Sequence, residues 1–258
     1  MFFLDSIVKS ARLFWQAAFP FFYAAIIKAQ VMLERIPFFD QQARLTDVTP
    51  GEMDRLWERG WRHFGVDFYR YTVDFDGEGV RLVMPLRVDL EKFSPSRSQR
   101  RILAKNRDVR VVVRESFIDR VKEDLFERHK QRFKERAPDS IYTFLSATPA
   151  SVPCRNREIC AYLGGRLIAA SFLDVGERAT SAVCAMFEPA ESKRSLGIFT
   201  MLEAIRYSWE RGCRYYYPGY AYHQPSVYDY KKNFRGLEYL DWRDGWRVYD
   251  SSPRREAG

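Results

Sequence analysis

The chain has 258 residues, of which 46% are hydrophobic and 16% aromatic. This composition excludes an intrinsically disordered protein, and the length is sufficient to bury a large core. The 42 lysines and arginines exceed the 34 acidic residues, and the resulting net charge of +8 indicates an anionic partner, either nucleic acid or an acidic membrane surface.

Cysteine and histidine usage gives no sign of a metal centre. The cysteines lack paired short spacings, which fits reduced thiols in a cytosolic protein better than a disulfide framework. No histidine stands near a second ligand in the sequence. We therefore expect no metal, no cofactor and a cytoplasmic location. The residues concerned are Cys154, Cys160, Cys184, Cys213, His63, His129 and His223.

Residues 1–36 are strongly apolar and aromatic. Their longest uncharged run, residues 13–27, is shorter than the roughly 20 residues that a membrane-spanning helix needs. No clear small-residue cleavage site marks a signal peptide. Two alternatives remain open. The segment lies at a membrane interface, or it forms a pair of helices, broken at Pro20, that cover the core or a dimer partner.

The next region is predicted to contain a helix followed by a hairpin. Thr49 and Glu52 have the spacing of a capping box, with Pro50 between them, so we expect a helix over residues 50–63. Apolar residues alternate on either side of residues 76–79, which is typical of a β-hairpin. Residues 87–90 extend the predicted sheet.

Residues 92–114 are the most basic part of the chain. They hold eight basic residues and a single acid, Asp108. Ser94 or Ser96 is predicted to cap a short helix, with Gln99 three residues after Ser96, and Asn106 suits its end. A basic helix of this kind is usually a solvated surface, but with one acid nearby it has few partners. Phosphates would fill that role, in contacts that weaken steeply with salt. The face in question carries Arg97, Arg100, Arg101 and Lys105.

The second half alternates between predicted strands and helices. A helix is expected over residues 115–136 and a shorter one over residues 141–145. Strands at residues 159–163 and 167–175 precede an apolar run at residues 182–187. A helix then follows, for which Ser195 is the predicted N-cap and Gly212 lies just past the end. An aromatic strand comes last, Tyr215, Tyr216 and Tyr217, which breaks at Pro218 and Gly219.

The start of this last helix has the character of a phosphate site. A helix N-terminus presents unpaired backbone N–H groups and a positive dipole end, and Lys193 and Arg194 add full charges there. An ordinary capped helix on a sheet is the alternative. The turn and the order of elements around it resemble the acyl-donor site of the acetyltransferase superfamily. That resemblance implies an α+β fold in which helices flank a mixed sheet.

A more specific resemblance begins at residues 93–101. Together with Asn106, this run resembles the signature of the aminoacyl-tRNA–protein transferases, the arginyl enzymes and the bacterial leucyl enzymes that extend protein N-termini. Residues 68–70 and 87–88 match as well, and so do residues 194–197 and the later positions Tyr217, Gly219, Tyr220, Tyr230, Lys231 and Phe234.

The chain departs from that family in its N-terminal part. Phe38 stands where the family has a cysteine, and residues 71–84 lack the family's cysteine cluster. The resemblance covers roughly residues 37–246 and does not reach the apolar extension. We therefore expect three regions, namely residues 1–36 as an apolar helical extension, 37–115 with the hairpin and the basic helix, and 116–258 as an acetyltransferase-like transferase domain.

The resemblance also implies roles for individual residues. Contacts to tRNA phosphates are expected from Lys193, Arg194, Ser195, Leu196, Gly197, Arg97, Gln99, Arg100, Arg101 and Lys105. Catalytic roles are expected for Tyr220, Tyr230 and His223. An acceptor or donor pocket is expected to contain Arg70, Arg87, Tyr217, Gly219, Lys231 and Phe234.

The function that follows is transfer of an amino acid from aminoacyl-tRNA to an amine, with a protein or peptide N-terminus as the first acceptor. Such an ester is already activated, so no protein nucleophile is needed. The partners would be aminoacyl-tRNA and a free amine, with peripheral membrane contact through residues 1–36. Two alternatives are an acyl-CoA-dependent N-acyltransferase and a non-catalytic RNA- or membrane-binding relative.

Replacing Arg97 and Arg194 together with glutamine is predicted to abolish tRNA binding, because both positions are expected to hold phosphates. Filter binding would measure the loss, and circular dichroism would establish that the variant remains folded. Unchanged binding by the folded variant would contradict the assignment.

Overall fold

The computed structural model describes residues 37–76, 79–133 and 137–250. The expectation for residues 1–36 lies outside these ranges. Within them, no helix combines the length and the apolar character needed to cross a membrane.

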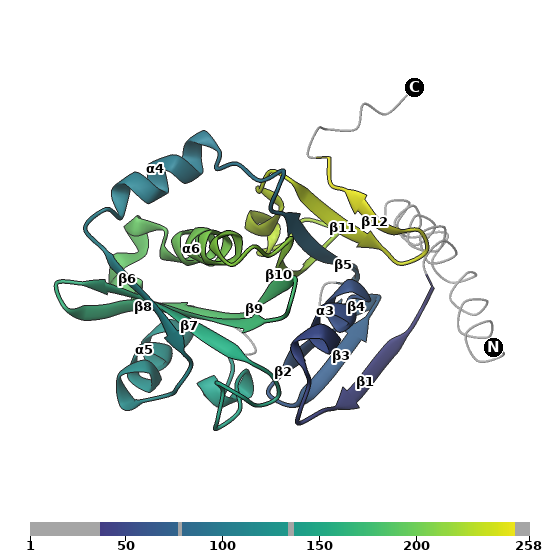
Figure 1. Cartoon of the computed structure of the whole chain (residues 1–258), viewed down its shortest axis with the longest axis horizontal. Coiled ribbons are helices and arrows are strands. Elements are labelled where there is room, and N and C mark those ends of the chain that lie inside the picture. Colours follow the sequence, from purple (N-terminus) through teal and green to yellow (C-terminus); the bar gives the residue numbers. More distant parts are fainter. Residues whose placement is uncertain (1–36, 77–78, 134–136, 251–258) are drawn as a thin grey trace, which may run out of the picture.

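One large mixed sheet forms the centre of the molecule (Figure 1). Its strands follow the order β12-β11-β5-β10-β9-β8-β7-β6, and β4 adds to β5. β10 runs parallel to β9, and the other pairs are antiparallel. The bounds are β4 Val73–Asp76, β5 Gly79–Asp89, β6 Arg110–Glu115, β7 Asn156–Leu163, β8 Arg166–Val175, β9 Ala179–Phe187, β10 Tyr215–Tyr222, β11 Leu237–Asp241 and β12 Gly245–Val248.

Helices cover both faces of this sheet, which confirms the expected α+β class. α6 (Leu196–Glu210) packs on β8, β9 and β10, and α4 (Arg97–Lys105) packs on α6. α5 (Arg120–Lys130) covers β8 and β9 from the other face (Figure 1). Burial of the apolar surface between these layers is the main stabilising contribution. On the α6 side the core includes Leu86, Ile159, Leu202, Ile205 and Tyr216.

A three-stranded antiparallel sheet lies beside the large one. Its order is β1 (Asp40–Arg44), β3 (Asp67–Tyr71) and β2 (Arg62–Phe64). α3 (Pro50–Glu58) begins with the predicted capping box and buries Trp57, whose ring lies 5.8 Å from that of Tyr217 on β10. Phe68 of β3 belongs to the same buried cluster as Trp57 and Tyr217, so α3 and the small sheet pack together against the centre of the large one.

A buried ion pair also connects the two sheets. His63 Nε2 lies 2.7 Å from Asp174 Oδ2 on β8, and His63 Nδ1 lies 2.8 Å from the carbonyl oxygen of Gly65. Both ring nitrogens face acceptors, so the ring is held as an imidazolium that donates from each nitrogen. Burial alone disfavours this charge, but the charge of Asp174 and the two hydrogen bonds outweigh it and raise the pKa of His63.

Cys154 joins His63 and Asp174 to give three metal-ligand atoms within 4.8 Å of one another, a cluster that the sequence spacing did not show. The geometry is that of a hydrogen-bonded ion pair, because the ring nitrogen facing Asp174 is occupied by a proton. Burial and the nearby Asp174 raise the pKa of the Cys154 thiol, which keeps it protonated. The cluster thus acts as a tie between the sheets.

Some predicted elements are shorter than expected or differ in their burial. The helix expected over residues 50–63 is α3, which ends at Glu58, and His63 belongs to β2 instead. The helix expected over residues 115–136 begins only at Arg120, and the preceding valines of β6 form an edge strand. Several large apolar side chains of the expected helices are exposed by 41–56%, namely Phe117, Val121, Phe133 and Trp209. The helix expected over residues 141–145 is a short 3-10 turn, Ile141–Thr143.

The replacement His63→Gln is expected to lower the free energy of unfolding by about 3 kcal/mol at pH 5.5, because it leaves Asp174 buried without its counter-charge. The pKa of His63 is raised on folding. The stabilisation is therefore fully present below the unfolded value of about 6.5 and is lost as the pH rises through the folded value.

Urea unfolding of both proteins between pH 5.5 and 9 would measure this, with the exposed His223→Gln as a control. A difference between wild type and His63→Gln that stays constant across this pH range would contradict a charged pair.

Candidate functional site

The large sheet opens between β9 and β10. The two strands pair in parallel only between residues 179–181 and residues 215–217. Beyond that point β10 stays paired with β5, and a bulge interrupts its register between Tyr216 and Gly219. Pro218 has no N–H to donate, and Gly219 has a φ of +95°, so both residues favour this break.

The carboxyl ends of β9 and β10 lie at the same edge of the sheet, because the strands are parallel. β9 leads through a 3-10 turn, η2 (Pro189–Arg194), directly into α6, so the N-terminus of α6 lies at this edge as well. In open sheets, ligands bind at such an edge, outside the carboxyl ends of the strands. The predicted phosphate turn and the end of the aromatic strand are therefore brought to one edge.

The first turn of α6 offers free backbone donors. Ser195 occupies the predicted N-cap position, but its φ is +56° and its side chain makes no capping hydrogen bond. Within the described residues, no hydrogen bond satisfies the N–H groups of Leu196, Gly197 and Ile198. A Cβ atom at Gly197 would meet only Phe187 at an ordinary 3.6 Å, so packing does not require this glycine. The turn keeps the features of an anion site.

The C-terminal end of α4 is hydrogen-bonded to η2, the turn that leads into α6, although nearly 90 residues separate them in the sequence. Lys105 Nζ donates to the carbonyl oxygen of Lys193. Asn106 Nδ2 donates over 2.9 Å to the carbonyl oxygen of Arg194 and also to that of Ile102. The structure thus joins the two regions that the sequence assigned separately to phosphate binding.

Arg194 already has anionic partners in this structure. Its guanidinium makes two hydrogen bonds of 2.9 Å to the carboxylate of Asp108, and its Nε lies 3.1 Å from Glu191. The hydrogen bond from Arg194 lowers the pKa of Asp108. A phosphate at this turn would have to share the Arg194 guanidinium with Asp108 or displace Asp108 from it. Asp108 is the one acid within residues 92–114.

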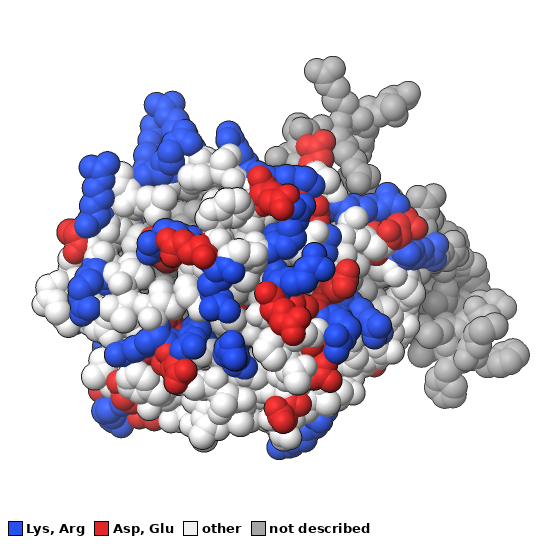
Figure 2. Space-filling view, in the orientation of Figure 1, with Lys and Arg blue, Asp and Glu red and all other residues white. Residues whose placement is uncertain are grey.

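The exposed face of α4 carries cations with no such partner. Arg97 and Arg101 are exposed, and neither has a carboxylate within 4 Å among the described residues. Arg100 donates over 2.6 Å to the carbonyl oxygen of Pro95. Figure 2 shows Lys and Arg side chains projecting over α4. Gln99 is instead buried, where it completes the capping box with Ser96 and donates to the carbonyl oxygen of Asn233.

Tyr220 lies at the other side of the opening, within a group of aromatic rings. Its hydroxyl donates over 2.5 Å to the carbonyl oxygen of Gly60. Its ring meets Tyr71 edge-on at 5.5 Å and Tyr69 at 6.1 Å. Burial raises the pKa of Tyr220, so its hydroxyl stays protonated near neutral pH and can donate a hydrogen bond.

Lys231 lies beside Tyr220, on the 3-10 turn η3 (Asp229–Lys232). Its Nζ donates over 3.0 Å to the carbonyl oxygen of Tyr220 and lies 4.8 Å from the ring centre of Tyr228. Burial, and secondarily the charge of Arg62, lowers the pKa of Lys231 to about 7. The amine is therefore partly neutral at physiological pH.

Arg62 is a site residue that the sequence reasoning missed. Its guanidinium lies 5.1 Å from the ring centre of Tyr217 and 5.7 Å from that of Tyr220. It donates to the carbonyl oxygens of Trp61 and Leu86, but its Nε has no partner within the described residues. In the sequence it lies at the end of a predicted helix, with no motif to mark it.

The other predicted residues have different surroundings. Tyr230 and His223 are exposed, and His223 meets the ring of Tyr239 edge-on. Four further side chains make contacts within the fold. Tyr217 packs between Trp57 and Trp246, Arg87 pairs with Glu238 at 2.8 Å, Arg70 donates to Gln41 and to the carbonyl oxygen of Arg59, and Phe234 is buried against Phe93.

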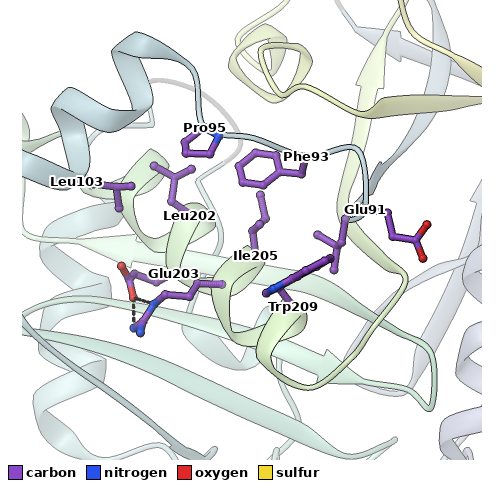
Figure 3. Close-up of a pocket in the computed structure, with 10 residues that line it drawn as sticks. Glu91, Phe93, Pro95, Leu103, Leu202, Glu203, Ile205 and Trp209 are labelled. Carbon is purple, nitrogen blue, oxygen red and sulfur yellow. Dashed lines mark hydrogen bonds and ion pairs between the residues drawn. The ribbon is translucent and has the colours of Figure 1, made fainter.

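An apolar groove of about 460 Å³ runs between α4 and α6. Figure 3 shows Phe93, Pro95 and Leu103 on one side, facing Leu202 and Ile205 on α6. Of its acids, Glu203 is bound to Arg206 and Glu91 to Arg214. The groove therefore offers apolar surface and no unpaired acid or base.

Known proteins share much of this sequence. Residues 120–241 match the family described as "Arginine-tRNA-protein transferase, C terminus". An aspartate/glutamate leucyltransferase from Xanthomonas axonopodis pv. citri (strain 306) is 35% identical over 179 residues, which cover 65% of this chain and 69% of the relative. The enzyme of the same name from Saccharophagus degradans is 30% identical over 193 residues, 71% of this chain and 78% of the relative.

Among solved structures, L-PGS from Bacillus licheniformis has a TM-score of 0.43 and 13% identity, with coverage of 68% of this chain and 52% of that one.

These relationships define the class of protein as an aminoacyltransferase that takes its amino acid from aminoacyl-tRNA. The chain belongs to the aminoacyl-tRNA–protein transferase family, as its motifs predicted.

The replacement Asp108→Asn is expected to tighten tRNA binding several-fold, because it frees the Arg194 guanidinium for a phosphate. Asp124→Asn is a matched control. It makes the same charge change on α5, on the opposite face of the sheet, where Asp124 pairs with Arg120. Filter binding at two salt concentrations would measure both variants, and equal gains in the two would show a general charge effect only.

Proposed function

We propose that this chain transfers an amino acid from aminoacyl-tRNA to the α-amine of a protein N-terminus, at the edge where β9 and β10 diverge. The observation that carries the proposal is the attachment of the C-terminal end of α4 to η2, the turn that leads directly into α6. It combines a row of exposed cations with free backbone donors in a single surface. We further propose an acetyltransferase-like arrangement, with the regions 37–115 and 116–258 contributing to the same site, and a cytoplasmic location, where aminoacyl-tRNA is found.

In this arrangement the N–H groups of Leu196, Gly197 and Ile198 hold a phosphate near the 3′ end of the tRNA. Arg97 and Arg101 contact phosphates of the acceptor stem. The 3′ ester then reaches toward Tyr220 along the edge of the sheet. Lys193 is exposed beside the first of these contacts and adds charge to it.

The reaction forms an amide bond between the acceptor nitrogen and the ester carbonyl carbon. The bond from that carbon to the ribose oxygen breaks, and the ribose leaves as an alcohol with the proton that the amine loses. An α-amine has a pKa of about 7.7 to 8.0, so a usable fraction is neutral near pH 7. Orientation of the two reactants supplies much of the rate.

Protonated tyrosines are suitable donors to the developing oxyanion. Tyr230 is 41% exposed, but desolvation by its surroundings still raises its pKa to about 12, and no hydrogen bond involves its hydroxyl within the described residues. Tyr220 would have to release the carbonyl of Gly60 before it donated to substrate. His223, exposed on the loop after β10, would relay a proton to the ribose oxygen.

The alternative, an acyl-CoA-dependent N-acyltransferase, would use the same turn of α6. That alternative would give no role to Arg97 and Arg101, which have no carboxylate partner among the described residues. A long polyanion such as RNA would contact both. The geometry and charge of this surface therefore favour RNA as the carrier of the acyl group.

Transfer assays with labelled donors would test the proposal. We expect transfer from an aminoacyl-tRNA to a peptide with a free N-terminus and none to the same peptide after N-terminal acetylation. Leucyl-tRNA is the first donor to test, because the relatives at 30–35% identity are named leucyltransferases. Arginyl-tRNA is the second. Transfer from acyl-CoA, with none from either tRNA, would overturn the proposal.

A further inference from the structure

Arg132 is an exposed cation at the edge of the sheet where β9 and β10 diverge, and no motif in the sequence marks it. It directly follows the C-cap of α5, the helix that covers the opposite face of the sheet from α4 and α6 (Figure 1). Its guanidinium lies 4.3 Å from the ring centre of Phe187, the last residue of β9. Arg132 therefore reaches from the α5 face to the end of the strand that leads into η2 and α6.

Phe187 also packs against the first turn of α6. A Cβ atom at Gly197 would lie 3.6 Å from Phe187 Cε1. The guanidinium of Arg132 and the free N–H groups of this first turn thus lie around one aromatic ring. A single phosphate group placed beside the ring can contact both.

His129 holds Arg132 and Phe187 in this arrangement. Its ring packs on Phe187 with the centres 4.7 Å apart, and its Nδ1 accepts from the backbone N–H of Phe187 over 3.2 Å. Burial lowers the pKa of His129, so the ring is neutral near pH 7 and this nitrogen can accept. The backbone N–H of Arg132 donates over 3.2 Å to the carbonyl oxygen of His129. The base of the Arg132 side chain is therefore fixed, whereas its end remains exposed.

Unlike the arginines around it, Arg132 has no anionic partner within the described residues. Arg128, on α5 itself, lies 2.9 Å from Glu188, and Arg166 lies 2.9 Å from Glu191. No hydrogen bond involves the guanidinium of Arg132 in the part of the chain that the structure describes. The cation lies over an aromatic ring, and the N–H groups at its rim are free to bind an anion.

The charge of Arg132 also reaches the tyrosine side of the opening. It acts on the hydroxyl of Tyr230 and opposes the desolvation that raises the pKa of this residue. Arg132 is therefore near both the first turn of α6 and a hydroxyl proposed to stabilise the oxyanion. In the terminal nucleotide of aminoacyl-tRNA, a single ribose separates the phosphate from the reactive ester. The closeness of Arg132 to both parts of the site fits this short separation.

We propose that Arg132 binds the phosphate that links the 3′-terminal nucleotide to the rest of the tRNA. This inference rests on the proposed function, because the ligand is the donor of that reaction. The N–H groups of α6 would hold the phosphate from one side, and the planar guanidinium would donate to two of its oxygens from the other. A double-stranded stem on α4 lies on the opposite face of the sheet, so the single-stranded 3′ end is the part that reaches Arg132.

The experiment measures binding of an acceptor-stem RNA with an intact single-stranded 3′ end. Its last internucleotide linkage is either a normal phosphodiester or an uncharged methylphosphonate. Wild type and Arg132→Gln are compared with both RNAs by filter binding. The neutral linkage is expected to weaken binding to wild type by about 10-fold more than binding to Arg132→Gln, because the charge-assisted hydrogen bonds need both partners.

Arg120→Gln is the matched control. It removes another exposed arginine of α5, at the N-terminal end of the helix, where Arg120 pairs with Asp124 at 3.0 Å. The penalty of the neutral linkage should be the same in this variant as in wild type.

Transfer assays separate the donor from the acceptor. Arg132→Gln should raise the KM for aminoacyl-tRNA about 10-fold and leave the KM for the acceptor peptide unchanged. A raised peptide KM with an unchanged KM for aminoacyl-tRNA would place Arg132 on the acceptor and contradict the inference.

An equal penalty of the neutral linkage in wild type and Arg132→Gln would overturn the inference and leave the proposed function standing. So would the absence of any penalty in wild type, whatever the folding of the variant. Wild type that binds neither RNA and transfers no amino acid from aminoacyl-tRNA would overturn the proposed function and the inference with it.

Discussion

The end of main-chain pairing between β9 and β10 is the constraint on which the rest of the site depends. These strands share hydrogen bonds only as far as Tyr217, and then β10 follows β5. Pro218 and Gly219 produce the break locally, one through its missing donor and the other through its positive φ. The opening lies between α6, which follows β9, and Tyr220, which lies on β10. A continuous parallel ladder would leave no such space.

The two sides of this opening differ in their electrostatics. On the α6 side, cations are exposed on α4 or paired at the surface, as Arg194 is with Asp108. Exposed charges of this kind are screened by salt and contribute little to the stability of the fold. They are suited to binding a long polyanion, because many weak contacts to its phosphates add up to a useful affinity. On the Tyr220 side the cations are largely removed from water. Charge there has a larger effect on a single small group.

The small sheet contributes both to the fold and to the site. It does so through the buried pair of His63 and Asp174 and through the cation next to that pair. β2 carries His63, which connects the sheets, and Arg62, which reaches the aromatic group of β10. Neighbouring side chains on a strand point to opposite faces. On β2, His63 therefore connects the two sheets, and Arg62 brings a positive charge to the site.

The sequence by itself determined the local elements and the family. The capping box at Thr49 starts its helix as predicted, and Ser96, one of the two predicted caps, starts α4. The hairpin at β4 and β5 forms where glycine and aspartate interrupt alternating strands. These features depend on contacts over a few residues, which is why spacing alone revealed them. The motif at residues 93–101 identified the family, because its residue types are specific.

Tertiary structure decided which of these residues meet. Asn106 reaches the carbonyl of Arg194 across 88 positions, and Arg62 reaches Tyr220 across 158, so no local spacing links them. His63, Cys154 and Asp174 are also far apart in the sequence, so only the structure shows that they form a cluster. The packing of distant strands determines which carboxylate lies beside which cation. The sequence therefore predicted the cations, and only the fold decided which of them remain without a counter-charge.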